Sequence, residues 1–441
     1  MVSGFFLKKD GIDKEIVRLT VPTVLSNISV PLLAMCDTAV AGHMGSEKYL
    51  AGIAIGSMMM STVFWLFSFL RAGTSGLTAS AFGASDRGRM AYALMRSLAL
   101  GIVMALAVAA LQTPILSLFK PAVGATEATF SLAARYFSIA MWGAVPMMVL
   151  TAVSGWFVGM QSTKSAMTVN IAMSALNVAF TLLLVYGAGM GYDGIPLGTV
   201  ASQWVILIPT LWLARRLSRR NGLAFSFDAR IFFDPQEWRM MFGVNSNLFF
   251  RSACLIAVSM SIYTFSARLG DVAVSANAVI NQLFLFFSYF MDGFAYTGEA
   301  VVGRWHGAGD FEMLRRYVRA LLRWSAVVTV VFSLFYLVAL PVLTSLLSDS
   351  EAVAASVEEC RIWVVLIPMA GAAAFIFDGF YIGLTRTRPM LISTLFGVAL
   401  FLTLLIFVAR SPWMLWMAFT CYLALRSMIL MILFPSNLKK T

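Results

Sequence analysis

Asp37 lies in a long segment of mostly apolar residues, and its carboxylate is the group in this chain best suited to chemistry. If the segment crosses a bilayer, the charged side chain costs roughly 2.5–3.5 kcal/mol to insert. Acidic residues retained at such a cost commonly bind protons, ions or substrate. A carboxyl group that binds and releases one proton as its surroundings open and close is the minimum requirement for proton coupling. The sequence therefore predicts a proton site at Asp37.

Other polar side chains in apolar segments could complete this site. Asn170, Asn177 and Thr181 fall in one such segment, and Thr199 and Gln203 fall in the next. Amide and hydroxyl groups at these positions can donate to a carboxylate or accept from its protonated form. We expect them to form a polar pocket around Asp37.

A second group of charges lies in the later half of the chain. Asp292, Glu299 and Asp378 are acidic residues in apolar segments, and Arg251 is a basic one. We expect Arg251 to neutralise one of the two aspartates, because unpaired charges within a membrane are costly. This group is either a buried salt bridge that holds the second half together or a binding site for substrate or an ion. Arg304 could pair with Glu299.

Enzymatic and metal-binding motifs are missing from the sequence. The two histidines, His43 and His306, are far apart, and the four cysteines form no C-x-x-C pair. No P-loop, G-x-S-x-G or H-E-x-x-H pattern occurs. We expect a protein without catalytic residues, cofactor or bound metal, and one that does not hydrolyse ATP itself.

Composition identifies the class of protein. Hydrophobic residues make up 60% of the 441 residues and charged residues only 12%, whereas a soluble domain carries about 25% charged residues. A helix needs about 20 apolar residues to cross a bilayer. Twelve such spans are predicted, and the fold class is an all-α polytopic membrane protein. The predicted spans are 16–41, 51–80, 92–118, 130–158, 166–188, 194–214, 240–267, 273–301, 320–347, 361–384, 390–409 and 412–434.

Basic residues predict the orientation of these spans. Of the 32 Lys and Arg residues, 24 fall at the termini and in alternate loops on one face, and Arg96, Arg304 and Arg426 are counted among them. Only Arg71 and Arg251 are assigned to spans. The positive-inside rule then makes both termini cytoplasmic, and the first span is retained because no signal-peptide pattern precedes it. The net charge of +11 is thus explained by topology and lipid contact, without nucleic acid.

The two halves of the sequence match at an offset of 224 residues. Gly155 and Gly159 align with Gly379 and Gly383, and the segment 83–86 aligns with 307–310. Six spans per half predict parallel repeats related by a pseudo-two-fold axis along the membrane normal. The predicted domains are an N-lobe at 1–214, a cytoplasmic linker at 215–239 and a C-lobe at 240–441. Such an arrangement places a cavity between lobes that rock to give alternating access.

Three segments carry a resemblance to a known family. The segments 26–43, 292–300 and 378–386 resemble the first, eighth and tenth helices of multidrug and toxic compound extrusion (MATE) transporters, in particular the DinF-like branch. By position, Asp37 matches that family's first-helix aspartate, and Asn177 and Thr199 match residues of the same polar pocket. Where many relatives have a second aspartate, this chain has Thr181, which disfavours a sodium site there.

The resemblance implies a secondary active multidrug exporter that exchanges protons for amphipathic, often cationic, organic compounds. Its partners would be drug-like small molecules and membrane lipids, and it would work as a monomer in the inner membrane. Two alternatives remain. One is sodium-coupled antiport through a C-lobe carboxylate such as Asp378, as in the NorM-like branch. The other is a flippase for a lipid intermediate, which the small number of arginines in the spans disfavours.

Overall fold

The computed structural model describes residues 11–42, 47–225 and 227–434 of the chain. The side chains of residues 30–39, 41–42, 47 and 122–123 also lie outside the described part. The part that is described is built from helices, with no strand in it. This confirms the all-α fold class.

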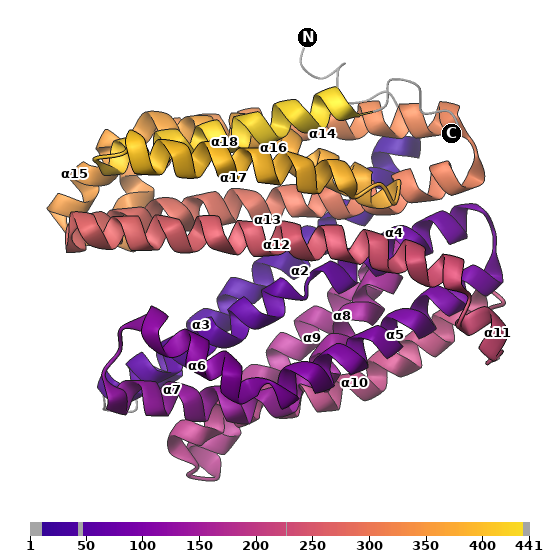
Figure 1. The fold of residues 1–441 in the computed structure, drawn as a ribbon, viewed down its shortest axis with the longest axis horizontal. Helices are drawn as coiled ribbons and strands as arrows, with labels where there is room; N and C mark the ends of the chain where they lie inside the picture. Colours follow the sequence, from indigo (N-terminus) through magenta and orange to yellow (C-terminus); the bar gives the residue numbers. More distant parts are fainter. Residues whose placement is uncertain (1–10, 43–46, 226, 435–441) are drawn as a thin grey trace. The chain divides into compact units, whose positions relative to one another are not determined.

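The first half of the chain contains α2 to α11 (Figure 1). Short turns of other helix types join some of them: the 3₁₀ turns Met141–Gly143 and Gly191–Asp193 and the π-turn Leu183–Gly187. The helices are α2 (Gly11–Gly42), α3 (Glu47–Leu66), α4 (Phe69–Gly83), α5 (Arg87–Ala110), α6 (Gln112–Val123), α7 (Glu127–Ala140), α8 (Ala144–Gly159), α9 (Thr163–Leu182), α10 (Gly194–Arg220) and α11 (Ala229–Phe232).

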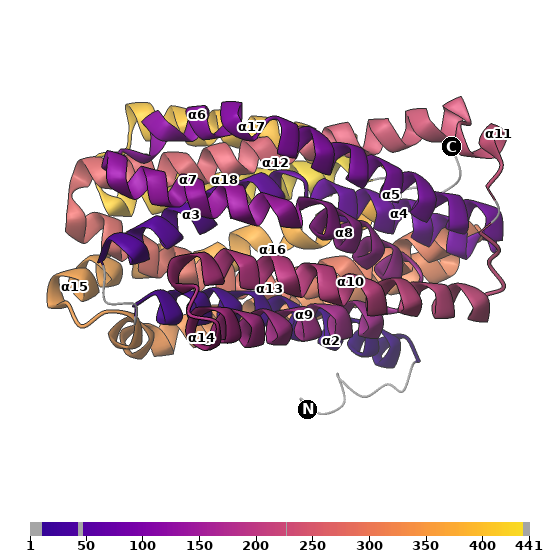
Figure 2. The ribbon, with the colours of Figure 1, turned by 90° about the horizontal axis from the view of Figure 1, so that it is seen from below.

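The second half has fewer and longer helices. They are α12 (Pro235–Leu269), α13 (Asp271–Ala308), α14 (Phe311–Leu347), α15 (Glu351–Glu359), α16 (Arg361–Gly383), α17 (Arg388–Phe407) and α18 (Pro412–Leu433). The short helix α15 packs against α13 and α14 and is seen at one end of them in Figure 2.

Eleven helical segments of the described residues are long and apolar enough to cross a membrane. In addition, α2 runs for 32 residues over the predicted first span at 16–41. Together they match the twelve predicted spans. Three of these spans are interrupted in the structure, where 51–80 is divided between α3 and α4, 92–118 between α5 and α6, and 130–158 between α7 and α8.

Local chemistry explains the break between α7 and α8. Pro146 has no N–H to donate to the carbonyl oxygen of Trp142, four residues earlier. The indole Nε1 of Trp204 on α10 donates to that oxygen instead, at 3.1 Å. The interruption therefore does not leave this carbonyl without a partner.

The chain divides into two compact units. One unit is Leu25–Arg239, and the other combines the chain up to Val24 with everything from Met240 onward. The first turns of α2 thus pack with the second half of the sequence, although they fall within the range predicted for the N-lobe. In that unit, the hydroxyl groups of Thr20 and Thr297 lie 2.8 Å apart.

The duplication seen in the sequence is present in the helix packing of each unit. A Cβ added to Gly155 on α8 would lie 2.2 Å from the carbonyl oxygen of Arg71 on α4. A Cβ added to Gly379 on α16 would lie 2.2 Å from the carbonyl oxygen of Ala295 on α13. Both pairs are separated by the same 224 residues, so each half contains the same close helix crossing, which only glycine permits.

The turns that follow these helices are duplicated as well. Asp86 and Asp310 cap the N-termini of α5 and α14, each accepting a backbone N–H from three residues later, at 2.9 and 3.0 Å. Gln161 and Thr385 follow α8 and α16 with φ of 60° and 56°. Positive φ is uncommon outside glycine, and its occurrence at matching positions indicates a shared turn geometry.

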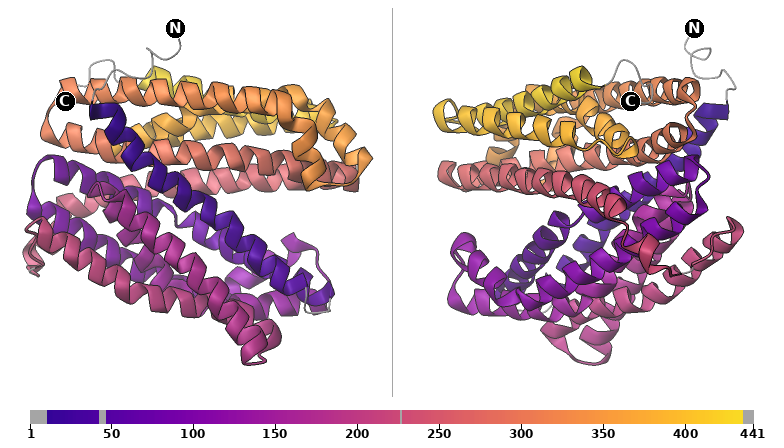
Figure 3. Two further views of the ribbon diagram at one scale, coloured as in Figure 1. Left: turned by 180° about the vertical axis from the view of Figure 1, so that it is seen from behind. Right: turned by 45° about the vertical axis from the view of Figure 1, so that its right-hand side comes forward.

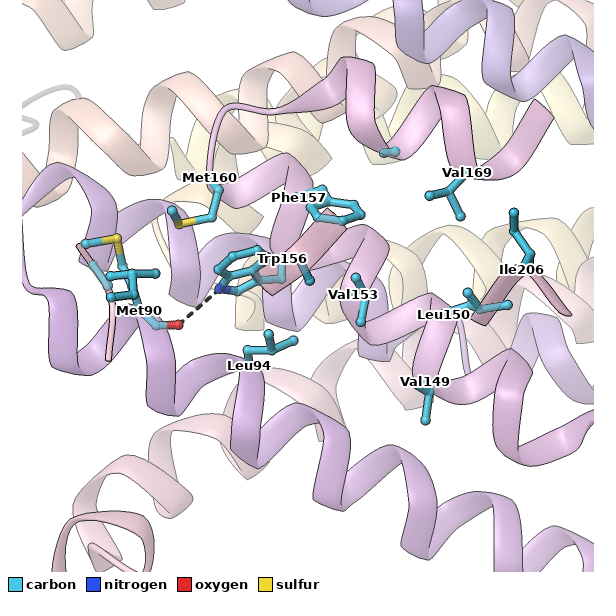
Figure 4. Close-up of a cluster of buried hydrophobic side chains, with 14 residues drawn as sticks. Met90, Leu94, Val149, Leu150, Val153, Trp156, Phe157, Met160, Val169 and Ile206 are labelled. Carbon is cyan, nitrogen blue, oxygen red and sulfur yellow. Dashed lines mark hydrogen bonds between the residues drawn. The ribbon is translucent and has the colours of Figure 1, made fainter. Parts of the chain in front are cut away.

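The core of the first unit surrounds Trp156 on α8 (Figure 4). This side chain is fully buried and packs in one cluster with Val153 and Phe157 of its own helix and Leu94 of α5. Its indole Nε1 donates to the carbonyl oxygen of Met90 at 3.1 Å. The cluster joins α5, α8, α9 and α10, which places the polar residues of α9 and α10 on a well-packed frame.

Candidate functional site: a polar network and a buried charge triad

Asp37 lies in the second half of α2, which Figure 3 shows as one long indigo helix. Its side chain, like those of its immediate neighbours, lies outside the described residues. The proton site predicted there remains a prediction. The polar residues of α9 and α10 that we expect near it can be described directly.

Asn170 on α9 contacts the described part of α2. Its Nδ2 donates to the hydroxyl of Ser26 at 2.7 Å. The hydroxyl of Ser26's neighbour Ser29 donates to the Ser26 carbonyl oxygen at 2.7 Å. Within the first unit, a predicted pocket residue therefore bonds to the helix that carries Asp37, three turns before it.

Asn177, Thr181 and Thr199, three of the residues predicted to line the pocket, form a polar network with one another. Nδ2 of Asn177 donates to Oγ1 of Thr199 at 2.9 Å, and Oγ1 of Thr181 lies 3.5 Å from Oδ1 of Asn177. Asn177 and Thr181 are each 1% exposed. Gly198 allows this contact, because a Cβ there would lie 2.5 Å from Oγ1 of Thr181. The network thus depends on a close approach of α9 and α10.

Gln203, one helical turn after Thr199, occupies a different environment. Its Oε1 is buried, has no protein hydrogen-bond donor, and lies where a Cβ of Gly143 would come within 2.0 Å. The side-chain amide oxygen of Gln203 thus packs against the turn between α7 and α8.

A charge triad of Arg251 (α12), Asp378 (α16) and Arg426 (α18) lies inside the second unit. Arg251 forms an ion pair with Oδ2 of Asp378 through Nη2. Nη2 of Arg426 contacts the same oxygen at 3.0 Å. Arg426 also donates from Nη1 to the hydroxyl of Tyr422 at 3.2 Å and lies over its ring. The expected partner of Arg251 is therefore Asp378.

Arg426 corrects two of our sequence predictions. It was counted among the basic residues of cytoplasmic loops, yet it lies inside α18 and is 5% exposed. The assignment of only Arg71 and Arg251 to spans is wrong for the same reason. Arg426 falls eight residues before the end of the predicted span 412–434, where a long side chain could have reached the surface. Its position inside that predicted span was the feature of the sequence that could have identified Arg426 as a membrane-embedded residue.

The triad contains more positive than negative charge. Two guanidinium groups, which remain protonated in proteins, share one carboxylate, so the net charge is +1. Three polar atoms of the triad are buried with no protein partner: Nε of Arg251, Nε of Arg426 and Oδ1 of Asp378. Buried charges are normally paired and fully hydrogen-bonded. This arrangement is therefore incomplete as a structural salt bridge.

Asp292 and Glu299 both lie on α13. Asp292 is half-buried, and Glu299 is 1% exposed. Arg304, which the sequence suggested as a partner for Glu299, pairs through Nη1 with Oε1 of Glu15 at 2.9 Å. Arg304 follows Glu299 by five residues, so the two side chains project about 140° apart around the helix.

Acidic residues at the start of α2, which sequence reasoning missed, pair with residues of α13 and α14 within the second unit. Glu15 accepts from the hydroxyl of Tyr317 as well as from Arg304. Asp13 pairs with Arg323 at 2.6 Å and accepts from Nε1 of Trp324 at 2.9 Å. These contacts fix the beginning of α2 to α13 and α14.

Arg96 is a second basic residue that the sequence placed in a loop. It lies in α5 and is 3% exposed. Its guanidinium donates to the carbonyl oxygens of Ile231 and Phe232 in α11 and pairs with Glu237 at 3.1 Å. Arg96 thus holds the segment that follows α10 against α5, where an exposed loop arginine was expected.

The fold and these buried polar groups define a polytopic helical membrane protein with an internal duplication. The MatE family model matches residues 22–183 and 248–408, one segment in each half. The chain therefore belongs to the MatE family, whose members are transporters and not enzymes. Its membership agrees with the resemblance found in the sequence.

Two curated relatives support this assignment. The chain is 34% identical over 423 residues to DNA damage-inducible protein F of Escherichia coli, covering 95% of this chain and 91% of the relative. It is 22% identical over 378 residues to the probable multidrug resistance protein NorM of Halalkalibacterium halodurans, covering 83% and 80%. The chain is thus a multi-pass membrane protein related to both groups.

Solved structures share the fold. A MATE protein in the bent conformation matches with a TM-score of 0.83 and 17% identity, covering 96% of this chain and 94% of that chain. A MATE complex with MaL6 matches with a TM-score of 0.81 and 18% identity, covering 95% and 94%. At these identities the match establishes the architecture alone, including its two lobes of membrane helices.

Proposed function

We propose that this protein exports amphipathic, often cationic, organic compounds in exchange for protons, and that Asp37 carries the proton. Family membership supports drug export in general. The main observation that favours a proton over sodium is the pairing of Asp378 with both Arg251 and Arg426.

This pairing disfavours a sodium site at Asp378. A sodium ion there would lie beside two guanidinium groups that already neutralise the carboxylate, and like charges at such distances repel strongly in a poorly solvated interior. The second-lobe carboxylate proposed for sodium coupling is therefore a poor cation ligand. Coupling through Asp37 is the simpler alternative.

The polar network of α9 and α10 supports a proton in preference to sodium at Asp37 as well. Asn177, Thr181 and Thr199 offer neutral amide and hydroxyl groups, and they bond to one another. Neutral donors and acceptors can serve both forms of a carboxyl group. Thr181 adds no second negative charge, which a sodium ion would favour.

In the proposed cycle, a proton from outside neutralises Asp37, α2 bends, and the compound is released outward. Loss of the proton to the cytoplasm restores the state that binds the next molecule. The proton drives this cycle only if it binds the two states with different affinity. A tenfold difference in proton concentration supplies about 1.4 kcal/mol per proton, enough for a modest gradient of exported compound.

The test is dye efflux from everted membrane vesicles, energised by an imposed pH gradient with sodium absent. Wild type is compared with Asp37→Asn, which cannot titrate, and with Asp37→Glu as the matched variant that can. We expect transport in wild type, at least tenfold slower transport in Asp37→Asn, and partial recovery in Asp37→Glu.

Other results would redirect the proposal. Undiminished transport by Asp37→Asn would place the coupling group elsewhere, at Asp292 or Asp378. Transport that requires added sodium would establish the sodium-coupled alternative. Movement of a labelled lipid across the vesicle membrane, with no dye transport, would favour the flippase.

A further inference from the structure

We infer that the charge triad of Arg251, Asp378 and Arg426 is a binding site for an anionic group, such as a carboxylate, sulfonate or phosphate carried by an amphiphile. The inference deepens the proposed function, on which it rests, by adding a class of substrate group beyond organic cations. Its basis is the charge and the unpartnered atoms of the triad.

The surplus charge is the first part of the argument. Asp378 is 7% exposed and Arg426 is 5% exposed, so water screens neither well. Two permanent positive charges and one negative charge leave +1 in this buried place. A bound anion would neutralise the triad, whereas a cation would add a second uncompensated charge.

The free donors are the second part. The Nε atoms of Arg251 and Arg426 are buried and have no protein acceptor. Each Nε belongs to a guanidinium group whose N–H groups are arranged to bind two oxygens of one oxyanion. A hydrogen bond from either Nε to an oxyanion is more stabilising than a neutral hydrogen bond, because donor and acceptor are both charged. The triad therefore lacks the acceptor atoms that an oxyanion provides.

Asp378 adds a further requirement. Its Oδ1 is buried and has no donor, while its Oδ2 accepts from both arginines. A ligand whose anionic group lies beside a hydroxyl or an amide N–H would satisfy this oxygen as well. The preferred ligand is thus an acidic amphiphile that also has a hydrogen-bond donor near its charge.

Arg251 is the member of the triad that a ligand can reach most easily. Its side chain is 19% exposed, while those of Asp378 and Arg426 are 9% and 6% exposed. It lies on α12, one turn after Asn247, whose Nδ2 donates to Thr387 at 3.2 Å. A ligand would first meet the partly exposed guanidinium of Arg251.

The duplication shows that the triad is a feature of one half alone. At an offset of 224 residues, its members correspond to Asn27, Ser154 and Ser202 in the first half, none of them charged. A charge cluster that served only to pack the repeated fold would be expected in both halves. The triad therefore serves something particular to the second half.

The test compares binding of two dyes with one xanthene core, fluorescein as the anion and tetramethylrhodamine methyl ester as the cation. Fluorescence anisotropy is measured on the purified full-length protein with no ion gradient, so failure of proton coupling would not affect the result. Arg251→Gln leaves one arginine paired with Asp378 and should fold. Arg251→Lys retains the charge, and Arg410→Gln removes an exposed charge elsewhere as the control.

We expect Arg251→Gln to weaken fluorescein binding by about 10- to 100-fold, in line with the loss of a charged hydrogen bond. Binding of the cationic dye should stay within twofold, Arg251→Lys should recover part of the loss, and Arg410→Gln should change neither dye. Displacement of fluorescein by short-chain phosphatidylglycerol but not phosphatidylcholine would identify a lipid headgroup as the anion. Absence of displacement would indicate that the natural anion is an exported compound and not a lipid headgroup.

Three results would overturn the inference. The first is no fluorescein binding by wild type, and the second is unchanged fluorescein binding by Arg251→Gln. The third is an equal loss for both dyes together with a lower melting temperature, which would make the triad a structural contact only.

Discussion

Cys360 lies in the turn between α15 and α16, and its side chain is 0% exposed. Burial raises the pKa of its thiol to about 12, and the nearby charge of Glu359 acts in the same direction. The thiolate is the reactive form of cysteine. At pH 8 a thiol with that pKa is ionised on the order of one part in ten thousand.

We predict that Cys360 resists N-ethylmaleimide in the folded protein at pH 8, with under a tenth modified when the unfolded protein is fully labelled. Mass spectrometry of the peptide that contains Cys360 measures this. Because the pKa is raised, increasing the pH from 7 to 9 should leave the folded protein's labelling slow. Rapid labelling of Cys360 at pH 8 would show that the turn opens.

The arginines show how burial changes the meaning of a residue. Arg96 and Arg426 have the same sequence environment as loop arginines near span ends, yet both are at most 5% exposed. Each is paired, Arg96 with Glu237 and Arg426 with Asp378. The difference lies in partners that are far away in the sequence.

Helix crossings at Gly155 and Gly379 are the main contacts to test at the level of elements. In each, the position of a Cβ would lie 2.2 Å from a backbone oxygen of the neighbouring helix, which no side-chain movement can relieve. Overpacking of this kind costs about 1–3 kcal/mol or more.

We predict that Gly155→Ala and Gly379→Ala each lower stability by about 3 kcal/mol. Gly243→Ala is the matched control, since its helical Cβ would meet nothing within 4 Å and should stabilise by about 0.5–1 kcal/mol. Thermal unfolding of the purified protein in detergent measures the order of the three. Equal melting temperatures for all three variants would contradict the close crossings.

At the level of the whole molecule, α2 belongs to two units. Up to Val24 it packs with the second half of the sequence, and from Leu25 it packs with the first. Asp13 and Glu15 fix its beginning through Arg323 and Arg304. The helix that carries Asp37 is therefore anchored at its start to α13 and α14.

We predict that the double variant Asp13→Asn with Glu15→Gln loosens this anchor. Losing these charged contacts should cost about 1–2 kcal/mol locally and speed amide exchange about 5- to 30-fold at the end of α13 and the start of α14. Hydrogen–deuterium exchange with peptide resolution measures this. Exchange in α8 of the other unit is the internal control, and equal acceleration there would indicate general destabilisation instead.

The sequence by itself determined the class of the protein, its twelve spans and its duplication. Spans of about 20 apolar residues follow from bilayer thickness, and backbone hydrogen bonding within a membrane leaves helices as the simplest solution. The glycines at 155, 159, 379 and 383 were visible as a repeat because close helix approach tolerates no Cβ. The Asn177, Thr181 and Thr199 group was predictable because helical spacing brings polar residues of adjacent spans to one level.

Only the tertiary structure decided which charges pair. Arg251 could have paired with Asp292 or Asp378, and Arg426 appeared to belong to a loop, because sequence spacing fixes depth along a helix but not its rotation relative to other helices. The carbonyl oxygen of Trp142, which Pro146 leaves without a helical donor, likewise accepts from a distant residue, Nε1 of Trp204. Contacts between residues more than 100 positions apart, such as Arg251 with Asp378, arise from packing, and packing is a property of the folded chain.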